Sequence, residues 1–328
     1  MKYVPFYLFL FFGFQRCIEV SPSKGPAYFE ETNSTLSPAT TSGQEIKGEE
    51  QFKQQNLTQQ DLERRSTKLK EAEADYTRDP DNEDNIIWYG RRLAYLGRYQ
   101  EAIAVYTEGL KKNPQSYKIY RHRGHRYITI RQFDNAIDDL QNAAFYASNA
   151  PNEIEPDGIP NSYNKPVSNI KWNIWYHMGL AYYLKGNYDK AISSYKKCME
   201  YTNNNDLDVA TTNWLYATYR KIGNTDAADA LASIIPSRMR LIENRGYHDL
   251  IMMYRGFVSP DILIRRNTEN NELNATIGYG IGNWYQLNGQ KDNARAVFEK
   301  VTSSTQWDSF GYLAAEKELK NMNSSGLQ

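Results

Sequence analysis

The 328-residue sequence has few of the features that mark disulfide-bonded, metal-bound, nucleic-acid-binding or membrane-spanning proteins. Its two cysteines, Cys17 and Cys198, are too few for a disulfide framework or a four-cysteine zinc site. Its 39 basic residues equal its 39 acidic residues, so no excess of positive charge favours nucleic acid as a partner. One short apolar run and a mean hydropathy of −0.73 exclude a protein with several membrane spans.

The amino terminus is predicted to direct export. Lys2 precedes an apolar run over residues 3–14, which has the length of the hydrophobic region of a secretory signal and is too short to span a bilayer comfortably. We therefore expect residues 1–17 to be a signal peptide. Cys17 stands where bacterial lipoproteins are acylated, although Arg16 replaces the small residue usual before that cysteine. An outer-membrane lipoprotein and a periplasmic or secreted protein both stay open.

Residues 18–57 are dominated by Ser, Thr, Glu, Gln, Gly and Pro. Such a segment cannot bury enough apolar surface to offset the entropy lost on folding, so we expect a disordered tether. The remaining residues are rich in aromatic side chains, since the whole sequence has 26 Tyr and 6 Trp.

The body of the chain repeats with a period of 34 residues. The first copy of the pattern consists of Gly90, Leu93, Ala102, Tyr106 and Gly109. It recurs 34 residues later as Gly124, Tyr127, Ala136, Leu140 and Ala143. It recurs 89 residues after the first copy as Gly179, Tyr182, Ala191, Tyr195 and Cys198, and 192 residues after it as Gly282, Tyr285, Ala294, Phe298 and Val301. Since 89 is two periods plus 21, an insertion of about 21 residues separates the second and third copies.

This pattern predicts a helical hairpin in each copy. Small residues such as Gly90 and Ala102 let two antiparallel helices approach closely, and large ones such as Leu93 and Tyr106 fill the space between hairpins. Gly97 is expected to end the first helix in a left-handed conformation. Each hairpin hides its apolar face only against the next, so the hairpins stack into a solenoid.

Residues 89–114 (YGRRLAYLGRYQEAIAVYTEGLKKNP) and 173–198 resemble the tetratricopeptide repeat. The resemblance implies an all-α, right-handed superhelical solenoid of about six helical hairpins. We expect the chain to be organised as a capping helix at 58–82, repeats 1 and 2 at 83–147, a Pro-rich insertion at 148–171, repeats 3–6 (two of them degenerate) at 172–306, and a capping helix with a tail at 307–328.

The sequence gives no convincing catalytic or metal site. His122 and His125 lie one helical turn apart, but no nearby cysteine or carboxylate cluster completes a metal site. The carboxylates of Glu153, Glu155 and Asp157 could act as an acid and base, but such groupings are common on solvated loops. We therefore expect no enzyme, no metal and no cofactor.

The resemblance implies that the first helix of each hairpin lines a concave groove. The groove residues are then Trp88, Arg91, Tyr95, Lys118, Arg121, His125, Tyr176, His177 and Tyr183. The residues that correspond to the carboxylate clamp of chaperone-binding members do not match it. They are Ile87, Arg91, His122, Asn173 and His177.

Cationic and aromatic side chains together suit an extended peptide, a carboxylate or a flat sugar face. Arg91 and Arg121 are expected to face one concavity and to lie outside the packing set. Replacing both by alanine should then leave the fold intact.

Three hypotheses about function follow, in decreasing order of support. The first is a non-catalytic scaffold of the bacterial cell envelope that binds a protein or peptide, with an acidic partner favoured. It would bind no nucleic acid and meet a membrane only through a lipid on Cys17. The second is an exported small-ligand or glycan binder that uses the groove and the insertion at 148–169. The third is a hydrolase that uses His177 or His248 with a loop carboxylate.

Overall fold

A computed structural model gives the fold and describes residues 57–269 and 272–325. The predicted signal peptide, Cys17 and all but the last residue of the predicted tether lie outside the described residues. No helix among the described residues is long and apolar enough to cross a membrane.

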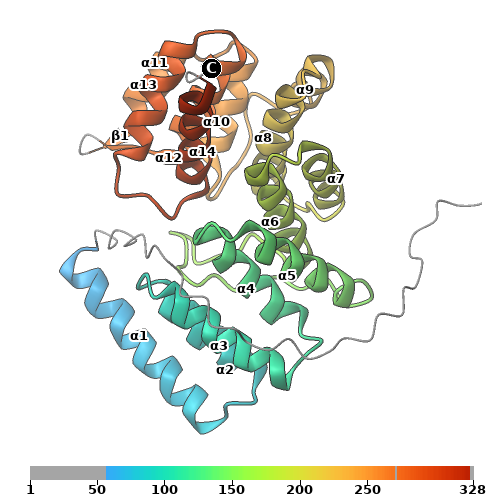
Figure 1. Ribbon diagram of the computed structural model, residues 1–328, viewed down its shortest axis with the longest axis vertical. Coiled ribbons are helices and arrows are strands. Elements are labelled where there is room, and N and C mark those ends of the chain that lie inside the picture. The colour runs from blue at the N-terminus through green and yellow to red at the C-terminus, as the bar shows by residue number, and fades with distance from the viewer. Residues whose placement is uncertain (1–56, 270–271, 326–328) are drawn as a thin grey trace, which may run out of the picture. The chain divides into compact units, whose positions relative to one another are not determined.

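The described residues form fourteen α-helices and one β-hairpin (Figure 1). The helices are α1 (Gln59–Arg78), α2 (Glu83–Ala94), α3 (Tyr99–Lys112), α4 (Tyr117–Thr129), α5 (Phe133–Tyr146), α6 (Ile170–Lys185), α7 (Tyr188–Met199), α8 (Asn205–Lys221), α9 (Thr225–Ser233), α10 (Arg245–Tyr254), α11 (Pro260–Arg266), α12 (Ala275–Leu287), α13 (Lys291–Thr302) and α14 (Phe310–Ser325). The hairpin pairs β1 (Thr268–Glu269) with β2 (Glu272–Leu273) in antiparallel register, with Thr268 opposite Leu273.

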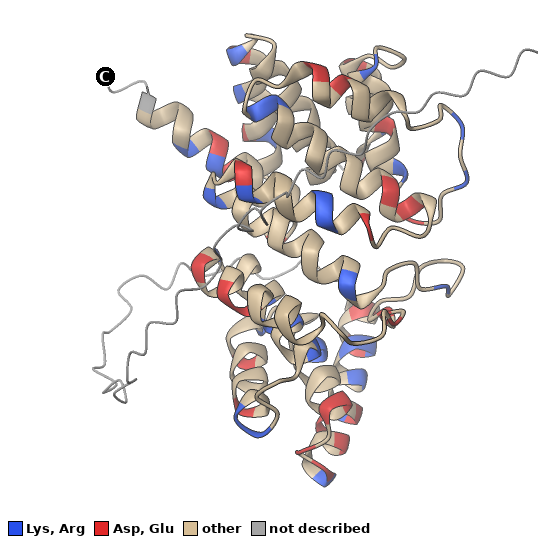
Figure 2. Ribbon diagram, turned by 90° about the vertical axis from the view of Figure 1, so that its right-hand side faces the viewer, with Lys and Arg blue, Asp and Glu red and all other residues tan. Residues whose placement is uncertain are grey.

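Six helix pairs, from α2/α3 to α12/α13, lie between α1 and α14, which confirms the predicted all-α array of helical hairpins. Most neighbouring helices pack in chain order, whereas α10 packs mainly on α8 and α12; among the first helices, α4 contacts both α2 and α6. Figure 2 shows basic and acidic residues interspersed along the helices.

The repeat positions pack as the pattern predicts. A Cβ atom at Gly90 would lie 2.4 Å from the ring of Tyr106, and one at Gly179 would lie 2.6 Å from the ring of Tyr195. The tyrosines of the second helices therefore fill the space that the missing side chains leave on the first helices. Both tyrosines are almost fully buried.

The turn inside each hairpin uses the left-handed conformation. Gly97 and Gly186 have φ angles of 76° and 89°. The equivalent residue of the second copy is Arg131, with φ 62°, a conformation that costs a non-glycine residue free energy. Its side chain offsets part of that cost, because the guanidinium donates to the carbonyl oxygen of Trp307 (2.9 Å) and reaches Glu316 (3.3 Å).

Side-chain caps fix where most helices begin. An Asn, Ser or Thr side chain at the N-cap accepts a hydrogen bond from a backbone N–H of the first turn, which would otherwise lack a partner. The residues that cap in this way are Thr58, Asn82, Ser116, Asn169, Asn187, Asn204, Asn224, Ser259 and Asn274.

Candidate functional site

The insertion between α5 and α6 folds back on itself and lies against the first helices. Its two ends pair at the bridge between Ile154 and Asn169. The amide of Glu155 donates to the carbonyl of Ser168 (3.0 Å), and the amide of Ile170 donates to the carbonyl of Glu153 (2.9 Å). The residues around Ile154 are thereby held in a strand-like pairing, and residues 153–158 contact α2, α4 and α6.

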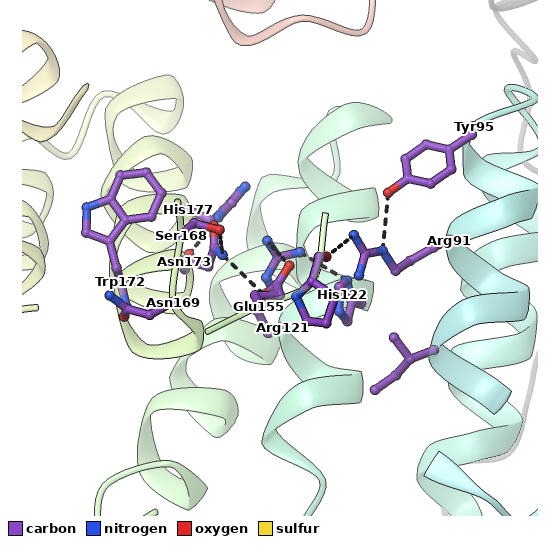
Figure 3. A network of polar contacts seen from close by, with 12 residues as sticks. Arg91, Tyr95, Arg121, His122, Glu155, Ser168, Asn169, Trp172, Asn173 and His177 are labelled. Carbon is purple, nitrogen blue, oxygen red and sulfur yellow. Dashed lines mark hydrogen bonds and ion pairs between the residues drawn. The ribbon is translucent and has the colours of Figure 1, made fainter. Parts of the chain in front are cut away.

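Glu155 is the centre of the polar contacts in Figure 3. One carboxylate oxygen lies 2.9 Å from an Nη of Arg121, and the other accepts a hydrogen bond from the amide of Asn173 at 3.2 Å. Glu155 and Arg121 are only 9% and 6% exposed. The insertion therefore places an ion pair in a buried position between α4 and α6.

A second set of contacts joins the insertion to α2. Arg91 donates to the carbonyl oxygen of Pro156 at 2.8 Å and to the hydroxyl of Tyr95 at 3.2 Å. Arg92 donates to the carbonyl oxygen of Gly158 at 2.9 Å. The Gly158 backbone packs so closely on Tyr95 that a Cβ atom there would lie 1.6 Å from the tyrosine hydroxyl.

Two contacts at partly buried positions complete this arrangement. Lys118 forms an ion pair with Glu153 at 2.9 Å. The guanidiniums of Arg91 and Arg92 lie 4.4 and 4.8 Å from the ring centroid of Trp88, within the range of a cation–π contact. We call the surface formed by Trp88, Arg91, Tyr95, Lys118 and Arg121 the insertion-covered face.

The structure corrects one expectation about this face. Arg91 and Arg121 do face the same region, since both hold the segment around Glu155. They are not outside the packing, because Arg91 is 9% and Arg121 is 6% exposed. Replacing both by alanine would leave Glu155 buried without its cation, so the double variant cannot be assumed to keep the fold intact.

Tyr176, His177 and Tyr183 form the helix-covered face, and here the expected groove is filled by later helices. The hydroxyl of Tyr176 lies 3.0 Å from that of Tyr247 in α10, and the hydroxyl of Tyr183 hydrogen-bonds to that of Tyr279 in α12. Burial raises the pKa of both α6 tyrosines well above the usual range.

All three residues of the helix-covered face are nearly fully buried, Tyr183 at 1% exposure. Lys317 of α14 also donates to the carbonyl oxygen of Tyr183 at 3.1 Å. The expectation that these residues line an open groove is therefore wrong. The degenerate repeats and the final helix pack directly against α6.

His125 lies at the boundary between the two faces. Its ring centroid is 4.3 Å from that of His177 and 5.4 Å from that of Phe310, the first residue of α14. His122 accepts from an Nη of Arg121 at 3.0 Å, and His177 Nδ1 donates to the Asn173 carbonyl at 2.6 Å.

Burial, with the nearby arginines, lowers the pKa of His122, His125 and His177 well below 6.5, so all three are neutral at pH 7. The described ranges contain no group of three or more His, Cys, Asp or Glu that could hold a metal ion.

Two hollows border the insertion. A cleft of about 230 Å³ opens between α2, α4 and the insertion, and Trp88, Lys118 and Ile154 are among its lining residues. A smaller cavity of about 100 Å³ lies behind Glu155 and is lined by Arg91, Tyr95, Tyr106, Arg121, His122, His125 and Arg126.

The smaller cavity holds unused hydrogen-bond donors. The Nε of Arg121 is buried without a hydrogen-bond partner. Arg126 contacts the ring of Tyr99 at 5.6 Å, and no ion pair to it occurs within the described part of the chain.

Sequence reasoning missed the roles of Glu155, Pro156 and Asn173. The acidic residues of the insertion were visible, and so were the arginines of the first helices. The signal that connects them is complementary charge, Glu153 and Glu155 against Lys118 and Arg121.

Models of the tetratricopeptide repeat match residues 90–152, 172–205 and 278–304. The chain therefore carries tetratricopeptide repeats in these three segments. It is 32% identical over 154 residues to BBSome complex member BBS4 of Bos taurus, a match that covers 44% of this chain and 25% of that protein. This repeat protein thus spans about a quarter of the length of the curated relatives that it matches.

The chain also matches two solved structures. A tetratricopeptide repeat protein from Parabacteroides merdae has 17% identity and a TM-score of 0.49, and the match covers 79% of this chain and 94% of that one. MamA has 19% identity and a TM-score of 0.40, with 53% of this chain and 91% of that chain covered.

Proposed function

We propose that this tetratricopeptide-repeat scaffold binds an extended segment of a partner protein at the insertion-covered face. The observation that carries the proposal is the partly open cleft of about 230 Å³, where the ring of Trp88, the ammonium of Lys118 and the guanidinium of Arg91 meet. An aromatic ring beside cations suits a peptide that brings both apolar and acidic side chains. The helix-covered face cannot serve, because its side chains are already buried.

Capture of partners from the native cell extract tests the proposal. The wild-type chain is expected to retain a stoichiometric protein, and the Trp88→Ala variant should retain much less of it. Phe257→Ala is the control, because it removes an exposed aromatic ring that lies 4.9 Å from an arginine, Arg255, whereas Trp88 is partly buried beside Arg91. Equal capture by both variants would move the site elsewhere. Binding to a sugar array without a protein partner would favour the glycan-binding alternative.

We also propose that the chain is exported to a bacterial cell envelope. The support is the order of Lys2, the apolar run 3–14 and Cys17 in the sequence. Mass spectrometry of the mature protein separates the forms. A lipid-bearing N-terminus at Cys17 indicates a lipoprotein, another processed N-terminus indicates a soluble exported form, and an intact Met1 on a cytosolic protein would contradict both.

A further inference from the structure

The insertion makes the contacts that a bound peptide would make. Arg91 and Arg92 donate to the backbone carbonyls of Pro156 and Gly158, which any extended peptide would present. Arg121 and Lys118 bind side-chain carboxylates of the insertion, which only an acidic peptide would present. The contacts run in order along residues 153–158, from Lys118 and Arg121 on α4 to Arg91 and Arg92 on α2.

We propose that residues 153–158 are an internal ligand of the insertion-covered face, and that the partner binds through an extended acidic segment that displaces them. The inference rests on the proposed function and names the chemistry of its partner. The insertion then acts as a competitor that the partner must remove before it binds.

Little apolar burial holds the segment in place. Ile154 is 66% exposed, and Glu153 and Pro156 are exposed as well. The segment is held mainly by hydrogen bonds and ion pairs, which a competing peptide can replace one for one. Segments with few buried apolar contacts open at a lower free energy than the core around them.

The ligand must be acidic because displacement of residues 153–158 leaves Arg121 without a carboxylate partner. With Glu155 gone, Arg121 would be left beside Arg91 and Arg126, which line the same cavity. Guanidiniums this close together repel one another when no anion lies between them, so a displacing ligand is favoured only if it supplies a carboxylate or an equivalent anion. Asp157 is a further carboxylate of the insertion near Arg91. Burial raises the pKa of its carboxyl, and the positive charge of Arg91 acts in the opposite direction.

A competing ligand can gain contacts that the insertion does not make. Glu155 meets Arg121 through one nitrogen, and the Nε of that arginine is buried without a partner. Arg126 also lines the cavity of about 100 Å³ behind Glu155. A carboxylate seated deeper in this cavity can bind Arg121 side-on, the stronger two-bond geometry.

The test measures binding of a synthetic, fluorescently labelled peptide with the sequence of residues 152–160 (NEIEPDGIP) by fluorescence anisotropy. Wild type should bind it weakly, because the tethered segment competes at an effective concentration in the millimolar range. Gly158→Ala should lower the apparent Kd at least tenfold, since the added Cβ collides with Tyr95 and undocks the insertion without changing any charge. The control Ser162→Ala, at an exposed position of the same insertion, should bind as wild type does.

Two further measurements test whether binding needs the acidic side chains and whether the peptide displaces the insertion. A peptide with glutamine at the positions of Glu153 and Glu155 should bind Gly158→Ala at least tenfold more weakly than the acidic peptide. In wild type, a saturating concentration of the acidic peptide should speed hydrogen exchange at the amides of Glu155 and Ile170, a readout that needs no variant.

Equal affinity of wild type and Gly158→Ala for the peptide, together with unchanged exchange, would overturn the internal-ligand inference. If partner capture still depended on Trp88, the proposed function would stand without it. Peptide binding as expected with no captured partner would contradict the proposed function while leaving the intramolecular competition intact.

Discussion

The insertion-covered face and the helix-covered face occupy equivalent first helices of successive repeats, yet they are covered in different ways. On α2 and α4, arginines and a lysine bind the carboxylates and backbone carbonyls of a loop. On α6, tyrosine side chains contact α8, α10 and α12. The ring centroid of Tyr183 lies 5.3 Å from that of Trp214 in α8, and its hydroxyl hydrogen-bonds to that of Tyr279 in α12.

We infer from this difference that the insertion can leave α2 and α4 without unfolding the chain, whereas α10 and α12 cannot leave α6. Polar contacts between a loop and a helix exchange readily for contacts with water or a ligand, so their net contribution to stability is modest. Buried aromatic rings lose both their transfer free energy and their packing when they are uncovered. The same structural position therefore serves as a binding surface in one repeat and as core in another.

The largest effect is expected from breaking the helix-covered face. Tyr183→Ala removes a ring that is 1% exposed, so the free energy of unfolding should fall by about 3–5 kcal/mol. Urea denaturation followed by circular dichroism measures this change. The control Phe257→Ala, which truncates an exposed ring, should stay within about 0.5 kcal/mol of wild type. A similar loss of unfolding free energy in both variants would contradict the prediction that Tyr183 is core and Phe257 is not.

Acid should destabilise the boundary between the faces. Burial lowers the pKa of His177 well below 6.5 in the folded chain, so at lower pH the unfolded chain takes up a proton that the folded chain does not. Stability is present above pH 6.5 and is lost as the pH falls below it. Between pH 7.5 and pH 5, the uptake of a proton by His177 in the unfolded chain should therefore lower the free energy of unfolding.

The measurement for this prediction is urea denaturation of wild type and His177→Gln across that range of pH. The glutamine variant should lose less free energy of unfolding than wild type does, because it has no imidazole to protonate at this position. Parallel pH profiles would show that His177 titrates normally in the folded chain.

Glu155→Ala tests the insertion-covered face, again through the free energy of unfolding measured by urea denaturation. Removal of one partner of a fully enclosed ion pair costs about 3–5 kcal/mol. Because the loop can open and let water reach Arg121, we expect a loss of only about 1–1.5 kcal/mol in the free energy of unfolding. A loss as large as that of Tyr183→Ala would make the insertion part of the core and would remove the contrast between the faces.

The smallest effect is expected at the turn after α4. Arg131→Ala and Arg131→Gly lose the same contacts with Trp307 and Glu316, but only glycine relieves the left-handed conformation at φ 62°. The glycine variant should therefore be more stable than the alanine variant by about 1 kcal/mol. Thermal unfolding compares the two directly, and a more stable alanine variant would argue against this backbone conformation.

The repeat pattern was enough to predict the hairpins, because Gly90, Tyr106 and their equivalents describe contacts between neighbouring helices. It also predicted that Arg91 and Arg121 lie in one region. It did not predict what covers them, since the contact between Glu155 and Arg121 joins a loop to a preceding repeat and leaves no periodic signal.

The burial of α6 escaped prediction for a related reason. Tyr176 and Tyr183 stand at positions that are open in an ideal solenoid. Their partners Tyr247 and Tyr279 belong to α10 and α12, and residues 209–274, where the pattern degenerates, lie between the second and third of the matched segments. Equivalent positions in a repeat predict equivalent backbone placement, but not equivalent exposure.

Native-state hydrogen exchange tests the contrast between the two faces most directly. The amides of Glu155 and of Ile170, the first residue of α6, donate to backbone carbonyls of the insertion, whereas those of residues 178–183 lie in the buried middle of α6. We expect the amides of Glu155 and Ile170 to exchange through an opening whose free energy is at least about 3 kcal/mol below that of the amides of residues 178–183. Exchange of both sets at the same, global free energy of unfolding would contradict it, because the insertion would then be as permanent a cover as the helices.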